Sequence, residues 1–178
     1  MLPDALRERA ARVKLLALDV DGVLTDGRLY YGPEGESLKV FDVKDGLGMR
    51  LLREEGIAIA IVSAKRSAML ERRLADLKIP DVCLGREDKR RALDEVCARV
   101  GASLDEVCFV GDDAFDLPVL RAVGLSAAPS DAHPIVKREV AWLLQARGGR
   151  GAVREVCDAL LEARGRLNAA IEALLSPR

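Results

Sequence analysis

Aromatic residues are scarce in this 178-residue chain, at 3%, and it contains one tryptophan and one histidine. Nucleic-acid-binding surfaces usually combine clustered cations with stacking rings. The chain has neither a long basic run nor many rings, and its net charge is −1. We therefore expect no nucleic-acid partner.

Long apolar runs are also missing. No segment approaches the roughly 20 apolar residues that a helix needs to cross a bilayer. The first residues, 1–14, are charged and helix-like, and they lack the apolar core and the small-residue cleavage site of a secretory signal. We expect a cytoplasmic protein without a membrane partner.

The four cysteines form no C-x-x-C pair. Cys83 and Cys108 lie in short apolar runs typical of buried strands, so we expect reduced, buried thiols rather than a metal site or disulfides. His133 lies in a loop-like segment and Trp142 in an apolar run. We expect a structural role for each of them.

Short apolar runs alternate with longer amphipathic segments along the chain. The runs predict strands at 14–20, 57–63, 81–85, 107–111 and 124–128, and the longer segments predict helices at 46–55, 67–78 and 87–100. Such alternation is typical of a parallel sheet with helices on both faces. The predicted fold class is α/β, one domain over 1–178 with a Rossmann-like sheet.

Residues 27–43 break this rhythm. Apolar and polar residues alternate there around a Gly-Pro-Glu-Gly turn. This pattern predicts a β-hairpin that projects from the α/β body.

Acidic residues follow two of the predicted strands. Asp19 and Asp21 come directly after the first, and Asp112 and Asp113 follow a later one, with Asp116 one helical turn on. Ligands of open α/β sheets bind outside the carboxyl ends of the strands, so these carboxylates should face one pocket. A hard cation would offset the cost of clustering them. Turn geometry is an alternative explanation for Asp21, and helix capping for Asp113 and Asp116.

Two further residues complete a set for phosphoryl transfer. Ser63 ends the run IAIAIVS, and Lys89 begins a predicted helix, where a lysine is usually solvated. With the carboxylates they provide a nucleophile, a metal site, a hydroxyl donor and a cation. These groups position a phosphoryl group and offset the charge on its oxygens.

The sequence resembles the haloacid dehalogenase superfamily of phosphatases. The matching motifs, in order, are DVDGV at 19–23, Ser63, Lys89 and GDDAFD at 111–116. The resemblance implies that Asp19 attacks phosphorus to form an aspartyl-phosphate, that Asp21 protonates the leaving oxygen and then activates water, and that Ser63 and Lys89 hold the phosphate. It implies Mg²⁺ as the cofactor, bound by Asp19, the main-chain carbonyl of Asp21, and Asp112.

Many members of this superfamily carry a cap domain inserted between the motifs. Here the hairpin, one helix and one strand use up the chain between Asp21 and Ser63, and one helix and one short strand use up the chain between Ser63 and Lys89. We expect no cap domain, and hence an exposed site that needs another element to exclude water.

A closer resemblance covers nearly the whole chain. The segments 19–52, 111–120, 124–137 and 148–158 are similar to the family of 3-deoxy-D-manno-octulosonate 8-phosphate phosphatases, which make an eight-carbon sugar acid used in lipopolysaccharide. The implied partner is a small anionic sugar-acid phosphate, and 42–46 is interpreted as a substrate-binding loop. The implied substrate contacts are Asp21, Asp42, Val43, Lys44, Asp45, Gly46, Arg50, Lys65, Arg73 and Lys89.

Arg50 and Arg73 lie near the apolar faces of their predicted helices. Such cations suit a substrate that carries a phosphate and a carboxylate. The alternative is a side chain that extends along apolar surface to reach water.

Two departures from the family leave the substrate open. Asp42 and Lys44 stand where the family usually has Asn and Arg, and the second motif reads Ser63-Ala64-Lys65 in place of Thr-Gly-Arg. Lysine replaces a bidentate arginine poorly at a carboxylate, and Lys65 resembles phosphatases of nine-carbon sugar acid 9-phosphates. We predict the eight-carbon substrate, with a nine-carbon acid or a non-catalytic regulatory homologue as alternatives.

The family resemblance also implies a homotetramer whose hairpins pack together and whose C-terminal tails reach neighbouring sites. The segment 148–151 is glycine-rich, mobile by composition, and carries a cation. The alternative is a glycine turn that leads into the last helix, with the hairpin folded on its own body. The hairpin residues that we expect to be exposed and apolar are Leu29, Tyr31, Leu38 and Val40.

Overall fold

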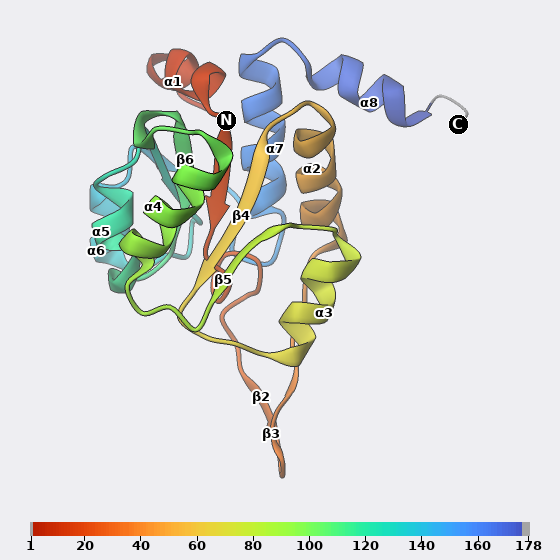
Figure 1. The fold of residues 1–178 in the computed structure, drawn as a ribbon, viewed down its shortest axis with the longest axis vertical. Coiled ribbons are helices and arrows are strands. Elements are labelled where there is room, and N and C mark those ends of the chain that lie inside the picture. The colour runs from red at the N-terminus through yellow and green to blue at the C-terminus, as the bar shows by residue number, and fades with distance from the viewer. Residues whose placement is uncertain (1, 176–178) are drawn as a thin grey trace.

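A six-stranded parallel sheet forms the centre of the computed structural model, which describes residues 2–175 (Figure 1). Its strand order is β5-β4-β1-β6-β7-β8. The strands are β1 Leu15–Leu18, β4 Ala58–Ser63, β5 Asp81–Leu84, β6 Val107–Val110, β7 Leu125–Ala128 and β8 Trp142–Leu143. The five predicted strands are confirmed, and β8 is a short sixth strand at one edge.

Helices cover both faces of the sheet, which confirms the predicted Rossmann-like α/β class. They are α1 Arg7–Arg12, α2 Val43–Glu54, α3 Ala68–Asp76, α4 Lys89–Val100, α5 Leu117–Leu120, α6 Pro134–Glu139, α7 Ala152–Ala163 and α8 Leu167–Leu175, with 3₁₀ turns at Asp4–Leu6, Leu104–Glu106 and Ala114–Asp116. Leu16 and Leu18 of β1 pack with residues of α2 and α7, whereas Leu15 and Ala17 pack with residues of α4 and α5. This burial on both faces explains why the strands are continuous apolar runs.

Side-chain caps fix where three of the helices begin. Asp42, Ser67 and Asp88 each accept a hydrogen bond from a main-chain N–H two or three residues further on, at 2.7, 3.2 and 3.0 Å. The cap at Asp42 corrects one prediction. Residues 43–46 are the first turn of α2 rather than a loop, because Asp42 satisfies one of the free amides of that turn.

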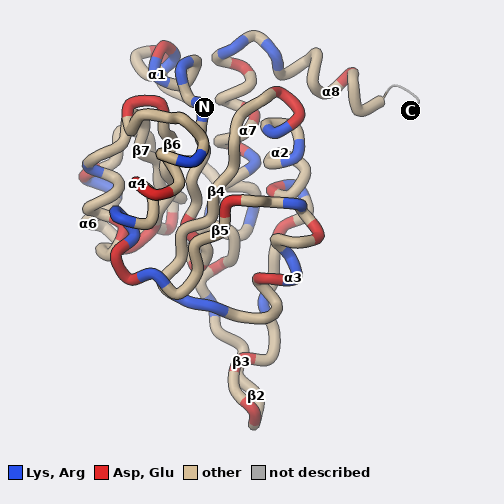
Figure 2. The backbone as a smooth tube through the Cα atoms, viewed as in Figure 1, with Lys and Arg blue, Asp and Glu red and all other residues tan. Residues whose placement is uncertain are grey.

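The predicted hairpin is present as β2 Tyr30–Gly32 and β3 Gly35–Leu38, which pair antiparallel. It projects beyond the end of the sheet (Figure 1) and carries few charged residues (Figure 2). Tyr31 is 71% exposed and Leu38 is 51% exposed. The arm therefore presents apolar surface away from the body of the chain.

The segment 148–151, expected to be mobile from its composition, is instead packed against the loop after β1, as in the alternative of a glycine turn that leads into the last helix. Gly149 donates its N–H to the carbonyl of Val23 at 2.9 Å. A Cβ on Gly148 would lie 1.8 Å from the carbonyl oxygen of Gly22, so only glycine allows this close approach. The glycines form a turn against the loop after β1, and α7 follows with most of its apolar residues buried in the core.

The cysteines and Trp142 have the structural roles that the sequence predicts. All four cysteines are buried and free, and Trp142 is buried on β8. Among residues 2–175, no helix is both long enough and apolar enough to span a bilayer.

Candidate active site

The carboxyl ends of β1, β4 and β6 bring the predicted catalytic residues together. Asp19 directly follows β1, and its N–H donates to the carbonyl of Val110 on β6 at 3.0 Å. Ser63 is the last residue of β4, on the other side of β1. Together with Asp21, Lys65, Lys89 and Asp112, Asp19 and Ser63 line a cavity of about 280 Å³.

Lys89 is buried even though it begins a helix. Its side chain is 6% exposed, and Nζ lies 2.9 Å from Oδ1 of Asp19 and 2.6 Å from Oδ1 of Asp116. Burial alone would lower the pKa of this ammonium, but the two carboxylates outweigh burial and the pKa is raised. Lys89 is thus a fixed positive charge beside Asp19 rather than a solvated surface lysine.

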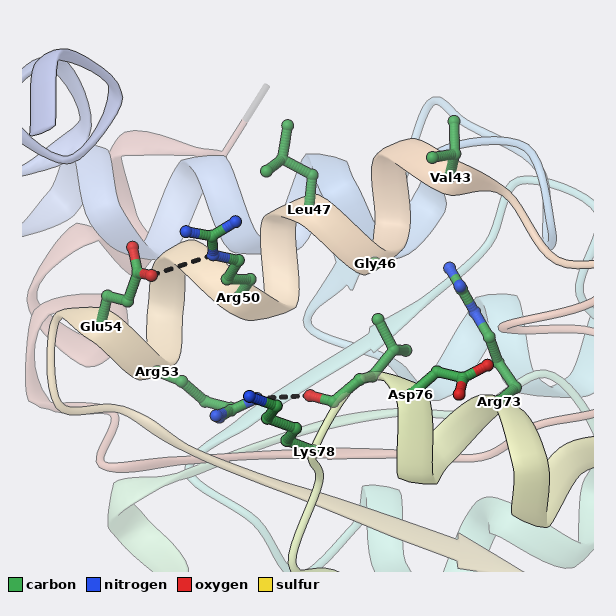
Figure 3. Close-up of a pocket in the computed structure, with 10 residues that line it drawn as sticks. Val43, Gly46, Leu47, Arg50, Arg53, Glu54, Arg73, Asp76 and Lys78 are labelled. Atoms are coloured by element: carbon green, nitrogen blue, oxygen red, sulfur yellow. Dashed lines mark hydrogen bonds and ion pairs between the residues drawn. The ribbon is translucent and has the colours of Figure 1, made fainter. Parts of the chain in front are cut away.

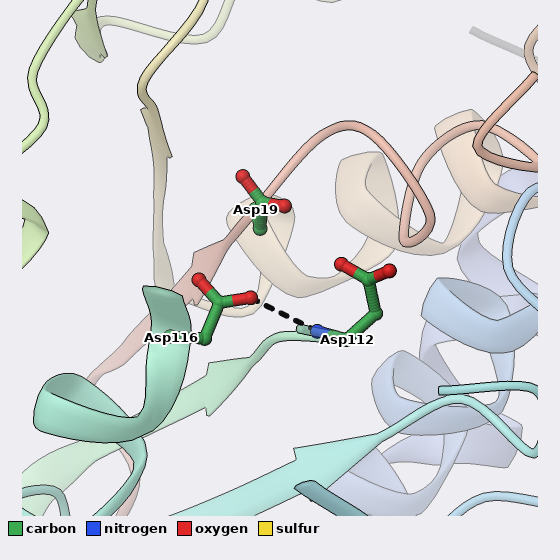
Figure 4. A group of neighbouring side chains, drawn as sticks. All are labelled: Asp19, Asp112 and Asp116. Carbon is green, nitrogen blue, oxygen red and sulfur yellow. Dashed lines mark hydrogen bonds between the residues drawn. The ribbon is translucent and has the colours of Figure 1, made fainter. Parts of the chain in front are cut away.

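Asp116 is a site residue that the motif analysis treats only as part of an acidic cluster or as a helix cap. Its carboxylate is 1% exposed, and Oδ1 accepts from Lys89. Oδ2 accepts from the N–H of Asp112 at 3.0 Å (Figure 4) and from the N–H of Asp113 at 3.3 Å. Asp116 therefore fixes both Lys89 and the loop after β6. The signal in the sequence was the spacing within GDDAFD.

The acidic cluster has the chemistry of a site for a hard cation. Carboxylate oxygens of Asp19, Asp112 and Asp116 lie within 4.8 Å of one another (Figure 4). Burial, followed by Asp19 and Asp116, raises the pKa of Asp112 to about 7, and burial and Asp116 also raise the pKa of Asp19 against the effect of Lys89. Mg²⁺ would relieve this repulsion. Both oxygens of Asp116 are engaged, which favours Asp19 and Asp112 as the ligands.

The loop after β1 lies directly against Asp112. Gly22 has a φ of +90°, and a Cβ at this position would lie 2.1 Å from Oδ2 of Asp112. Glycine is required there because any larger residue would displace the carboxylate. The Asp21–Gly22 peptide, whose Asp21 carbonyl is the third predicted metal ligand, is thus held beside Asp112.

The carboxylate of Asp21 meets two lysines. Oδ1 lies 2.5 Å from Nζ of Lys39 at the base of the hairpin, and Oδ2 lies 4.0 Å from Nζ of Lys65. Lys39 is absent from the set of residues predicted from the motifs. No local pattern could have shown it, because the contact depends on how the hairpin folds back onto the loop after β1.

Seven of the ten predicted substrate contacts divide between two cavities. Asp21, Lys65 and Lys89 line the catalytic cavity, whereas Val43, Gly46, Arg50 and Arg73 line a separate cavity of about 580 Å³ between α2 and α3 (Figure 3). Arg50 pairs with Glu54 at 2.9 Å, and the guanidinium of Arg73 lies 6.0 Å from the ring centroid of Phe41. Within one chain, Arg50 and Arg73 therefore line a cavity that Asp19 does not line.

Three further predicted contacts lie at the start of α2. The side chain of Asp42 caps the helix, and Lys44 is exposed. Asp45 is 1% exposed, and its Oδ1 accepts from the N–H of Arg154 at the start of α7, at 2.7 Å. Burial raises the pKa of Asp45 to about 6 against the effect of this hydrogen bond. In this structure the Asp45 carboxylate anchors α7.

His133 has a structural role, as predicted. It precedes α6, and its Nδ1 accepts from the N–H of Ile135 at 3.2 Å. The main-chain N–H of His133 donates to the carbonyl of Asp112 at 2.8 Å. His133 thereby supports the main chain of Asp112 from outside the catalytic cavity.

Comparison with known proteins agrees with this geometry. A 3-deoxy-D-manno-octulosonate 8-phosphate phosphatase of Yersinia pestis is 43% identical over 167 residues, which cover 94% of this chain and 89% of that protein. The chain belongs to this phosphatase family. The phosphatase of the same name from Escherichia coli K12 is 43% identical over 91% of this chain and 86% of its own length. The family model for haloacid dehalogenase-like hydrolases matches residues 43–124.

Solved structures of this phosphatase family share the fold. The Yersinia pestis crystal structure has a TM-score of 0.92 and 42% identity, covering 94% of this chain and 90% of that one. A Moraxella catarrhalis phosphatase in complex with magnesium ion, phosphate ion and KDO has a TM-score of 0.93 and 35% identity, covering 97% and 99%. The chain is thus a phosphatase of the haloacid dehalogenase type, a hydrolase of phosphoric monoesters.

Proposed function

We propose that this protein hydrolyses 3-deoxy-D-manno-octulosonate 8-phosphate, with Mg²⁺ as the cofactor and Asp19 as the covalent nucleophile. The observation that carries the proposal is the buried Asp19–Lys89–Asp116 cluster beside Asp112, in a chain 43% identical to phosphatases named for that substrate. The cluster combines a fixed nucleophile with positive charge for the transferred group, as phosphoryl transfer requires.

The reaction then has two steps. First, a carboxylate oxygen of Asp19 bonds to phosphorus while the bond from phosphorus to the ester oxygen breaks, and Asp21 gives its proton to that oxygen. Second, water attacks the aspartyl-phosphate and gives a proton to Asp21, while the bond from Asp19 to phosphorus breaks and phosphate leaves.

The remaining residues of the cavity hold the phosphoryl group. Ser63 is 3% exposed and Lys89 is 6% exposed, so both are held in the wall of the cavity. Their hydroxyl and ammonium can donate to phosphoryl oxygens. Mg²⁺ held by Asp19, the Asp21 carbonyl and Asp112 would offset the charge of the carboxylates and of the phosphoryl oxygens.

The proposal includes a homotetramer in which one chain completes the site of another. Seven of the ten predicted substrate contacts line two cavities of one chain, and Arg50 and Arg73 lie in the one without the nucleophile. A single substrate could meet both groups if the second cavity of one chain faced the catalytic cavity of its neighbour. The exposed apolar hairpin supplies a surface for such assembly.

The proposed biological role is lipopolysaccharide biosynthesis in the cytoplasm. What supports it is the substrate for which the relatives are named, an eight-carbon sugar acid phosphate. The cytoplasmic location expected from the sequence belongs to the same proposal.

A comparison of two substrates tests the choice of sugar acid. With Mg²⁺ present, we expect kcat/KM to be at least about tenfold higher for the eight-carbon 8-phosphate than for a nine-carbon keto acid 9-phosphate. A tenfold preference for the nine-carbon compound would overturn the choice of substrate and leave the phosphatase chemistry standing.

The nine-carbon alternative is favoured by one observation, which is that Lys65 lines the catalytic cavity where the family usually has arginine. Lys65→Arg restores a planar donor for a carboxylate and should raise the preference for the eight-carbon substrate. Arg66→Lys, at the neighbouring exposed position, serves as the control. A non-catalytic homologue is disfavoured because Asp19, Ser63 and Lys89 are all in place.

A further inference from the structure

Lys39 has a buried side chain that the reaction outlined above does not use. It lies between β3 and α2, at the base of the hairpin, and its side chain is 3% exposed. Nζ lies 2.5 Å from Oδ1 of Asp21 and 3.1 Å from Oε1 of Glu36 on β3. A lysine is seldom buried to this extent unless its charge is paired, and both partners here are carboxylates.

The Asp21 side chain is contacted by cations from outside its own loop. The loop after β1 contains Gly22 and Gly27, both with positive φ, and the Asp21 side chain is 23% exposed. The other cation near it, Lys65, is 60% exposed and lies 4.0 Å away. Lys39 is therefore the closer and more firmly held of the two cations at the Asp21 carboxylate.

We propose that Lys39 is a positioning residue that holds the Asp21 carboxylate at the site, so that the hairpin base and the loop after β1 together orient the acid–base group. The proposal rests on the role assigned to Asp21 under the proposed function. Acid–base groups work only when held within hydrogen-bond reach of the reacting atom. A side chain left to rotate would spend part of its time out of reach.

The competing explanation is that the ion pair merely fastens the hairpin to the body of the chain. Loss of a fastening, in a Lys39→Met variant whose mass by light scattering matches that of the wild type, would lower stability and reduce all phosphatase activity alike. Loss of a positioning contact would act selectively, on reactions whose leaving group must be protonated. The chemistry of the leaving group therefore separates the two explanations.

The test compares kcat/KM for p-nitrophenyl phosphate and for a sugar-acid phosphate. Nitrophenolate departs without a proton, whereas a sugar alkoxide needs one, and kcat/KM reports only the steps up to departure. Lys39→Met should lower kcat/KM for the sugar-acid phosphate by about tenfold or more and for p-nitrophenyl phosphate by less than about threefold, given the usual contribution of a general acid. Lys39→Arg, which keeps a charged donor, should recover most of the loss.

A matched control is Lys14→Met, which removes a lysine paired with Glu106 beside the opposite end of β1. It should leave both rates unchanged. If Lys39→Met does not fold, Lys39→Gln keeps a shorter polar side chain and takes its place in the same comparison.

If Lys39→Met lowers kcat/KM equally for both substrates, or lowers it for neither, the positioning role of Lys39 is overturned. Asp21→Asn separates this outcome from a failure of the proposed function. If Asp21→Asn shows the selective loss and Lys39→Met does not, only the role of Lys39 is refuted. If Asp21→Asn lowers kcat/KM equally for both substrates, the acid role of Asp21 is refuted together with the proposal built on it.

Discussion

At the scale of single residues, Asp19 is the residue whose loss should reduce activity most, because it is the proposed nucleophile. Asp19→Asn replaces a carboxylate with an amide that cannot attack phosphorus, while the hydrogen bond from the Asp19 N–H to Val110 is kept. We expect turnover to fall by at least about 10³-fold, the order seen when a nucleophile is removed. Phosphate release measures it, with circular dichroism and a melting curve to show that the variant is folded. Substantial residual turnover would contradict the covalent mechanism.

The side chains that could bind a metal at this site offer only carboxylate oxygens as ligands. We expect a chelator to abolish activity and added Mg²⁺ to restore it, with Mn²⁺ or Co²⁺ as substitutes, because Asp19 and Asp112 offer hard donors. Asp112→Asn should raise the Mg²⁺ concentration needed for half-maximal rate, since it removes one charged ligand. Full activity after exhaustive chelation would show that the cluster serves another purpose.

Asp19, Ser63 and Asp112 could be predicted from the sequence because each lies at the carboxyl end of a buried strand, and parallel strands end at one edge. The motifs point to Lys89 and Asp116. Their burial could not be predicted, because it arises only when α4 and the loop after β6 meet. Lys39 could not be predicted, because its partner Asp21 lies in another segment and no periodicity connects them.

At the scale of elements, Asp45 connects α2 to α7 and makes their contact sensitive to pH. Its pKa of about 6 in the folded chain lies above the unfolded value of 3.8, so its contribution to stability is full below about pH 4 and is lost as pH rises through 6. Between pH 5 and pH 8 the wild type should lose about 1 kcal/mol of unfolding free energy relative to Asp45→Asn. Urea unfolding at both pH values, at fixed Mg²⁺, measures this difference. A difference that stays constant or changes sign would show that the carboxylate is better accommodated than its burial indicates.

Element boundaries were less predictable than the elements themselves. Residues 42–46 were interpreted as a loop from the family resemblance, yet the Asp42 cap and packing against α7 make 43–46 helical. The two-residue strand β8 carries too short a pattern to show periodicity. The glycines at 148–151 suggested mobility, whereas the close approach of Gly148 to Gly22 uses the missing side chain for packing.

At the scale of the whole molecule, this packing changes which truncation is informative. Removing everything from Gly148 onward would delete α7, whose residues Val153, Val156 and Leu160 are fully buried in the core. Such a variant should fail to fold, because the loss of several buried apolar side chains exceeds the stability of an ordinary domain. A cut after Ala170, the one buried residue of α8 among those described, removes only the partly buried Leu174 from contact with the core and is the appropriate test of whether a tail affects a neighbouring site.

The hairpin provides the test of assembly. Tyr31 and Leu38 expose 71% and 51% of their surface on an arm that packs against little of its own chain (Figure 1), and apolar surface of this kind is normally covered in an oligomer. We expect light scattering to give a mass near four chains for the wild type, and smaller species for Tyr31→Glu combined with Leu38→Glu, because the charges cannot be buried between arms. Tyr31→Phe, which keeps the ring, is the control and should stay assembled.

If the proposed facing of the two cavities is correct, the dissociated variant should lose kcat/KM for the sugar-acid phosphate more than for p-nitrophenyl phosphate, since each isolated chain keeps its own Asp19 and lacks its neighbour's Arg50. A wild-type chain that is monomeric and fully active would refute both the assembly and the shared site.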